Sequence, residues 1–429
     1  MKDIKKALFM KEAASGKGHN ILVEICIAVL LFFIGSTAMG FIQVPAIIAY
    51  LLSNKDYMSM IMTGRLDTQK MLSVMSDMPE WIMIVMLFAE ILLTVIVLFY
   101  CRFFEKRKLS TLGFVKKGMF KQYVLGLLAG AAAFSVVYLI CVITGSVKCS
   151  GIATDIIPLY ITGYFLGYML QGMAEEVLCR GYLMVSLSRR YHVTLAIVAS
   201  SLFFAFLHSA NSGLSPLAYL NLFLFGVFAS LLLLDFGNIW IAGAFHSVWN
   251  FVQGNVYGVQ VSGMKVSNSI LSTSYTNGME IINGGSFGME GGLSVSFVFL
   301  AGIIMLSYHL YKKGDIVDLQ ELEGVNGGSS STISVTERGI NITGMDSITS
   351  SEDNTNAPDI KNVNNADYNN YNSPDEINAD NIIINKDADV LDGDIIKNNN
   401  LNSGINAKET DTENNNVQKT AFNQDYFKN

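Results

Sequence analysis

The chain has 429 residues, of which 51% are hydrophobic and 15% are charged, and its mean hydropathy is +0.38. A soluble globular domain carries roughly 25% charged residues, so this composition argues against a soluble enzyme. Residues 315–429 hold 21 acidic and 7 basic side chains, a net charge of −14. Because the whole chain carries −7, residues 1–314 carry +7. No basic domain stands apart from the apolar segments, which excludes a nucleic-acid-binding protein.

Eight apolar runs predict a polytopic membrane protein. They lie at about 21–40, 81–100, 123–144, 157–186, 194–209, 217–234, 238–252 and 293–311. A hydrocarbon core about 30 Å thick needs about 20 helical residues, and most of the runs are long enough. The two shortest runs count as spans because the runs on both sides of each are spans. We therefore predict an all-α membrane helix bundle of about eight spans over residues 1–314.

Basic residues orient the predicted spans. They form four clusters, which are Lys2 to Lys17, Arg102 to Lys121, Arg189 with Arg190, and Lys312 with Lys313. With eight spans all four clusters fall on one side of the membrane, and the positive-inside rule makes that side cytoplasmic. The prediction is a multi-pass protein of the plasma membrane with both termini in the cytoplasm. The first run follows a basic segment and is interpreted as an uncleaved anchor.

The composition identifies two polar segments outside the apolar runs. Residues 253–292 are rich in Gly, Ser and Asn and are predicted to form an extracytoplasmic loop. Residues 315–429 contain 23 Asn and no Cys, His or Trp. So little apolar surface cannot offset the entropy of ordering the chain, which predicts a disordered, acidic, cytoplasmic tail.

Polar side chains inside three of the predicted spans are the candidates for function, because an ionisable residue there costs roughly 2.5–3.5 kcal/mol on insertion scales. They are Glu175, Glu176 and Arg180 in the run 157–186, His208 in 194–209, and His246 with Asn250 in 238–252. Glu176 and Arg180 are four residues apart with the acid first, the favourable order for a helical ion pair. Such a pair would leave the carboxylate of Glu175 available for another role. His246 and Asn250 share a helix face at the same spacing, as do Phe204 and His208.

This set of side chains suits hydrolysis. A carboxylate held in an apolar pocket is a stronger base than one in water, so Glu175 could activate a water molecule. An imidazole can ligate zinc or donate a hydrogen bond to an oxyanion, and the amide of Asn250 can do the latter. His208 and His246 are therefore the candidate ligands if Zn²⁺ is the cofactor. The HExxH motif is absent, which excludes the standard zincin helix.

Simpler interpretations stay open for several of these residues. Glu176 and Arg180 could form a structural ion pair only, and Phe204 could serve only in packing. Cys179 is interpreted as a buried thiol rather than a nucleophile. The segment 284–288 matches the GxSxG pattern of hydrolases, but no strand precedes it, and we attribute the match to chance.

The motifs resemble those of the CPBP family of intramembrane proteases, the CAAX proteases and bacteriocin-processing enzymes, also named Abi. Its signature is EExxxR, then FxxxH, then HxxxN or HxxxD, on three membrane helices. All three motifs occur here in that order, as Glu175 to Arg180, Phe204 to His208, and His246 to Asn250. The resemblance covers residues 157–252, less than a quarter of the chain, so substrate choice cannot be carried over with it.

The resemblance implies a role for each residue. Glu175 and His208 would activate the hydrolytic water, His246 and Asn250 would stabilise the oxyanion, and Glu176 with Arg180 would hold the site together. The function implied is a CAAX-type intramembrane metalloendopeptidase, which hydrolyses a membrane-associated or prenylated-like substrate within the lipid bilayer.

Two alternatives remain. One is a non-catalytic membrane protein that binds a peptide, for example in bacteriocin immunity. The other is a secondary transporter with a proton-coupled Glu, but the inverted repeats that it would predict are not evident in the sequence.

Overall fold

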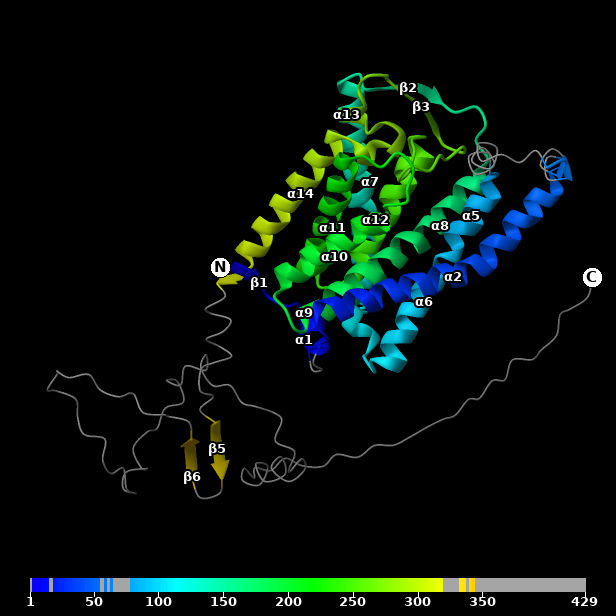
Figure 1. The fold of residues 1–429 in the computed structure, drawn as a ribbon. Coiled ribbons are helices and arrows are strands. Elements are labelled where there is room, and N and C mark those ends of the chain that lie inside the picture. Colours follow the sequence, from blue (N-terminus) through cyan, green and yellow to red (C-terminus); the bar gives the residue numbers. More distant parts are fainter. Residues whose placement is uncertain are drawn as a thin grey trace, which may run out of the picture. The chain divides into compact units, whose positions relative to one another are not determined.

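The computed structural model describes residues 2–14, 18–54, 58–59, 62–64, 78–318, 332–336 and 339–343. The chain divides into two units, residues 1–345 and 346–429, and the second unit lies outside the described residues. The first unit is a helix bundle (Figure 1). Its helices are α1 (Leu8–Ala13), α2 (Ile21–Ser53), α5 (Glu80–Ala89), α6 (Ile91–Phe99), α7 (Met119–Ile143), α8 (Pro158–Glu176), α9 (Val185–Ser188), α10 (Val193–Leu207), α11 (Pro216–Phe236), α12 (Ile239–Phe251), α13 (Glu280–Asn283) and α14 (Leu293–Lys312).

Shorter elements join these helices. The π-helical segments are η1 (Tyr100–Phe104), η3 (Val177–Met184) and η4 (Val252–Val256), and the 3₁₀ turns are η2 (Leu109–Leu112), η5 (Gly285–Phe287) and η6 (Met289–Gly291). The strands β1 (Lys2–Ile4), β2 (Val147–Ile152), β3 (Leu271–Tyr275), β4 (Ile316–Asp318), β5 (Thr332–Thr336) and β6 (Gly339–Thr343) form three antiparallel pairs, β1 with β4, β2 with β3, and β5 with β6.

Each of the eight apolar runs is helical, which confirms the predicted membrane helix bundle. Within the described ranges, five helical segments are long and apolar enough to cross a membrane, namely 21–53, 80–104, 119–143, 216–236 and 293–312. The other three runs are α8 with η3 and α9, then α10, then α12 with η4. They are shorter or carry the polar motif residues, and they form the centre of the bundle.

The four basic clusters lie at one end of the bundle. The carboxylate of Glu105 pairs with Arg107 at 3.0 Å and with Arg189 at 3.2 Å, which joins the second cluster to the third. Strand β1 pairs with β4, which brings the first cluster beside the segment that follows α14. Figure 1 shows β1, α1 and α9 at this end and β2, β3 and α13 at the opposite end. The arrangement is the one that the positive-inside rule requires of a single cytoplasmic face.

Glycines let two helices approach α12 closely. A Cβ atom at Gly130 of α7 would lie 2.5 Å from the carbonyl oxygen of Phe245, and one at Gly172 of α8 would lie 2.6 Å from the amide nitrogen of Ser247. Both separations are shorter than a real contact, so only glycine fits at either position. Small residues at such crossings are typical of membrane bundles, where backbones pack closely without intervening side chains. The polar residues of α8 are thereby brought against those of α12.

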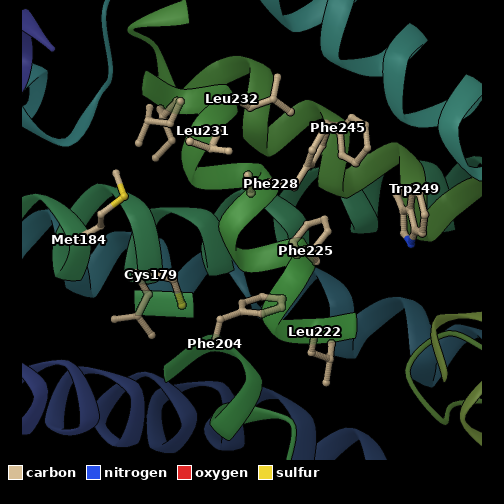
Figure 2. Packing of buried hydrophobic residues seen from close by; sticks show 14 of the residues in the cluster. Cys179, Met184, Phe204, Leu222, Phe225, Phe228, Leu231, Leu232, Phe245 and Trp249 are labelled. Carbon is tan, nitrogen blue, oxygen red and sulfur yellow. The ribbon is translucent and has the colours of Figure 1, made fainter. Parts of the chain in front are cut away.

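An aromatic cluster fills the centre of the bundle beside these crossings (Figure 2). The ring centroids of Phe204 in α10 and Phe225 in α11 are 5.3 Å apart, and those of Phe228 in α11 and Phe245 in α12 are 4.9 Å apart. Rings at such distances pack favourably in tilted arrangements. The cluster fixes the positions of α10, α11 and α12 relative to one another.

Both polar segments contain secondary structure within the described residues. The predicted loop 253–292 contains η4, β3, α13, η5 and η6, and β3 pairs with β2. At the start of the predicted tail, β4 pairs with β1, so the boundary at residue 314 cuts through a structured segment. Strands β5 and β6 also fall in the predicted tail, whereas the rest of it lies outside the described residues.

The N-terminal strand caps a helix of the bundle. The carboxylate of Asp3 accepts hydrogen bonds from the amides of Val193 at 3.1 Å and Thr194 at 2.9 Å, at the first turn of α10. The Thr194 hydroxyl donates a third bond at 2.7 Å. Burial alone would raise the pKa of Asp3, but the hydrogen bonds from Thr194 and Val193 outweigh it and hold the pKa below its ordinary value.

Replacing Asp3 by Ala should lower the free energy of unfolding by about 1 kcal/mol at pH 7, the usual effect of losing a helix cap. A depressed pKa stabilises the fold above the unfolded value near 4, and the stabilisation is lost as the pH falls through the folded value. Thermal unfolding of the detergent-solubilised protein at pH 7 and at about pH 3 measures both effects. A wild-type advantage that stayed constant between these pH values would contradict the prediction.

Candidate active site

The ion pair predicted between Glu176 and Arg180 is present. The Arg180 Nη1 atom donates to Glu176 Oε1 at 2.9 Å, and both side chains are fully buried. The guanidinium lies 4.5 Å from the centre of the Phe204 ring and 5.5 Å from that of Phe225, distances at which a cation is attracted to the ring face. Phe204 thus contacts the buried cation, in addition to its packing role.

Glu176 also orients a histidine. The His246 Nδ1 atom lies 3.0 Å from the same Oε1 atom of Glu176, across the close contact between α8 and α12. A carboxylate only accepts hydrogen bonds, so Nδ1 carries the proton and Nε2 faces away from Glu176. The neighbouring residue of α8, Glu175, lies on the side to which Nε2 points.

Glu175 faces both histidines of the motifs. Its Oε2 atom lies 3.8 Å from His246 Nε2 and 3.9 Å from His208 Nε2. His208 Nδ1 is bound at 2.9 Å by the carbonyl oxygen of Phe204, so this nitrogen carries the proton and Nε2 is directed at Glu175. Glu175 Oε2 is buried and has no hydrogen-bond partner within the described ranges. Such separations are too long for direct hydrogen bonds and leave room for a small polar molecule between the three groups.

An amide that the sequence interpretation missed connects Glu175 to Asn250. Gln171 lies one helical turn before Glu175, and its Nε2 atom donates to Glu175 Oε1. Its Oε1 atom accepts a hydrogen bond from Asn250 Nδ2 at 2.9 Å. The relay holds one oxygen of Glu175 and leaves the other facing the imidazoles. A polar residue at i−4 from Glu175 in an apolar run was the signal in the sequence.

These residues open onto a cavity of about 240 Å³. One water molecule needs roughly 15 Å³ by this measure, so the cavity accommodates water together with part of a larger molecule. Most of its wall comes from α2, α5, α8, α10 and α12 and from the segment around Val261. All four residues predicted to be catalytic, Glu175, His208, His246 and Asn250, line it.

The loop that follows α12 covers one end of this cavity. Ser262 lines the cavity with a positive φ of 47°, a conformation uncommon outside glycine. Its amide and hydroxyl donate to Glu290 Oε2 at 2.7 and 2.8 Å, and its carbonyl accepts from Asn211 at 2.9 Å. The predicted external loop is therefore part of the wall of the site.

A second missed residue is Glu90, between α5 and α6. It also lines the cavity. It is the one charged residue between Trp81 and Cys101. An ionisable residue inside an apolar run is a candidate for function, so this position was the signal in the sequence.

Two other candidates lie away from the cavity wall. Cys179 is fully buried in the hydrophobic cluster (Figure 2) and is not among the residues that line the cavity. The GxSxG segment contains the turn η5 rather than an elbow between strand and helix. At Gly288, with φ of 95°, a Cβ atom would lie 2.2 Å from the carbonyl oxygen of Gln260, so this glycine serves close backbone packing.

The candidate metal ligands His208 and His246 both face Glu175. Over the described ranges, no group of three His, Cys, Asp or Glu side chains is placed to hold one ion. Each Nε2 atom lies 3.8–3.9 Å from Glu175 Oε2, slightly longer than the separation of about 3.3 Å between two ligands of one tetrahedral Zn²⁺.

The site combines a carboxylate, two imidazoles and two amides around a cavity that accommodates water, inside a membrane bundle. These are the groups that a hydrolytic site needs. Residues 157–252 match the family model described as type II CAAX prenyl endopeptidase, Rce1-like. The match covers α8 to the start of η4, the same segment as the three motifs, and confirms the resemblance found in the sequence. It supports protease activity at the level of the family. No curated protein matches the chain.

Proposed function

We propose that this protein is an intramembrane endopeptidase that hydrolyses a peptide bond of a membrane-associated or prenylated-like substrate. The observation that carries the proposal is the buried, unpartnered Oε2 atom of Glu175, which faces two imidazole nitrogens across a cavity that accommodates water. We place the protein in the plasma membrane with cytoplasmic termini, because the basic clusters share one end of the bundle.

In the proposed reaction, Glu175 Oε2 and His208 Nε2 hold a water molecule. As its oxygen attacks the carbonyl carbon of the peptide bond, Glu175 takes one proton. The carbonyl oxygen becomes an oxyanion, which His246 and the second N–H of the Asn250 amide stabilise. Glu176 accepts the Nδ1–H bond and so orients the His246 ring, and a proton on Nε2 is what donates to the oxyanion. When the C–N bond breaks, the proton on Glu175 passes to the leaving amine.

The remaining polar residues act as positioning residues. Arg180 balances the charge of Glu176, which in turn orients His246. Gln171 fixes the Glu175 carboxylate relative to Asn250. In this scheme Glu175 and His208 activate the water, and His246 acts on the oxyanion. If Zn²⁺ is the cofactor, His208 and His246 would hold it, and it would supply a Lewis acid.

This function is tested with membranes from two cell lines. One carries the wild-type protein, and the other carries the His208→Ala variant. Mass spectrometry of peptide termini should find termini that are at least about 100-fold less abundant with the variant, the usual contribution of one acid–base group. Equal termini at matched protein levels would favour a cavity that only binds a peptide. Wild-type membranes treated with a zinc chelator form a parallel sample, and loss of the termini there would show that the histidines act through a metal.

A further inference from the structure

Glu90 presents an unexplained carboxylate to the proposed active site. It lies at the junction where α5 ends and α6 begins, and it lines the same cavity as Glu175 and the two histidines. A charged residue in the middle of an apolar helix is costly, and it is retained where it pairs with another group or serves function.

Three buried acids of the bundle have partners, whereas Glu90 is only partly buried. Glu24 accepts from the Tyr182 hydroxyl at 3.1 Å, Glu176 pairs with Arg180, and Asp235 is bound by His309 at 2.8 Å. Over the parts of the chain that the structure describes, no hydrogen bond or ion pair involves the Glu90 carboxylate. A cation brought beside such an acid stabilises its charged form.

The cavity itself does not supply that cation. Its described lining contains no Lys or Arg, and its nearest other acid is the proposed base, Glu175. On the side of Glu90 the wall is formed by Met83, Met86 and Leu87 of α5. A long apolar stem with a charged end, as in Lys or Arg, matches a wall of this composition with an acid at its end.

We propose that Glu90 and the apolar residues beside it form a subsite that binds a Lys or Arg side chain of the substrate near the scissile bond. The proposal rests on the proposed endopeptidase function and adds a substrate class to it. An anion there would meet two carboxyl groups and no cation in the described lining, so the subsite disfavours a free C-terminal carboxylate at this position. The favoured substrate is an apolar peptide with a basic residue, cut at an internal bond.

The test uses the full-length protein in lipid vesicles and synthetic peptides that span a cleavage site whose appearance depends on Glu175. The peptides differ only at the basic position, which carries Lys, Met or Glu, and each is made with a free and with an acetylated N-terminus. Wild-type protein should cleave the Lys peptide about tenfold or more faster than the Met peptide, the effect expected of a desolvated charge pair. Acetylation should leave this ratio unchanged, since it removes only the terminal amine.

Variants of Glu90 complete the test. Glu90→Gln should bring the Lys-to-Met ratio close to one, and Glu90→Asp should keep a preference for Lys. Glu280→Gln, the same change at an exposed acid outside the cavity, should keep the wild-type ratio. Three results would overturn the subsite alone. They are Glu175-dependent cleavage with no preference for the Lys peptide, a Lys-to-Met ratio that Glu90→Gln does not alter, and a preference for Lys that is lost on acetylation. Absence of any Glu175-dependent cleavage would overturn the endopeptidase function as well.

Discussion

Replacing Glu175 by Gln is expected to lower the rate of peptide cleavage by a factor of about 10²–10⁴, the usual contribution of a general base. Gln keeps the size of the side chain and an oxygen that can accept from Gln171. It cannot take a proton from the water that the proposed reaction places between His208 and Glu175. The measurement is the rate at which protease-dependent termini appear, with the protein reconstituted in vesicles and its amount matched to the wild type.

The control for this variant is Glu280→Gln, which removes a carboxylate of the same type from an exposed position on the loop. Its rate should equal that of the wild type. Thermal unfolding of Glu175→Gln should differ little from the wild type, because the Glu175 carboxylate borders the cavity and makes no ion pair shorter than 3.8 Å. Retained cleavage by a folded Glu175→Gln protein would show that another group activates the water.

Replacing Arg180 by Met is expected to lower the free energy of unfolding by about 3–5 kcal/mol, the cost of leaving one charge of a buried pair uncompensated. Arg180 is fully buried, so water cannot take the place of its bond to Glu176. The Phe204 and Phe225 rings would also lose the cation that lies over them. Denaturation in detergent, followed by a conformational probe, measures this loss.

A second substitution separates the charge from the packing. In the double variant Glu176→Gln with Arg180→Met, no buried charge is left unpaired and the Gln oxygen can still accept from His246. The double variant should therefore be more stable than Arg180→Met alone, as double-mutant cycles of coupled groups show. If the two substitutions destabilised the protein additively, the pair would contribute through packing and not through charge.

The sequence predicted the helices and the polar centre well because both follow from local chemistry. An apolar run of membrane length must satisfy its own backbone, and a helix does so within one segment. The spacing of four between Glu176 and Arg180 predicted a contact that is present at 2.9 Å. The motif order predicted that Glu175, His208 and His246 meet, and the structure brings them within 4 Å.

The missed features depend on contacts between distant segments. Gln171 matters because Gly172 lets α8 approach α12, and only then does its amide reach Asn250. Strand β4 pairs with β1 across more than 300 residues, which no local pattern signals. Glu90 was visible in the sequence, but it belongs to no motif, and its place in the cavity depends on how α5 packs against α8.

The π-helical segment η3 begins directly after the two glutamates of α8. Each π-type bond encloses one residue more than an α-helical bond, so the segment sets the helical phase of everything that follows it. Deleting one residue between 177 and 184 would let the helix return to regular α geometry. It would leave the downstream part facing nearly the same way, because the wider π-type turns hold the extra residue without adding a full residue's rotation. Arg189 would therefore still face Glu105, so the extra residue of this segment shapes the helix beside the two glutamates and leaves the basic end of the bundle in place.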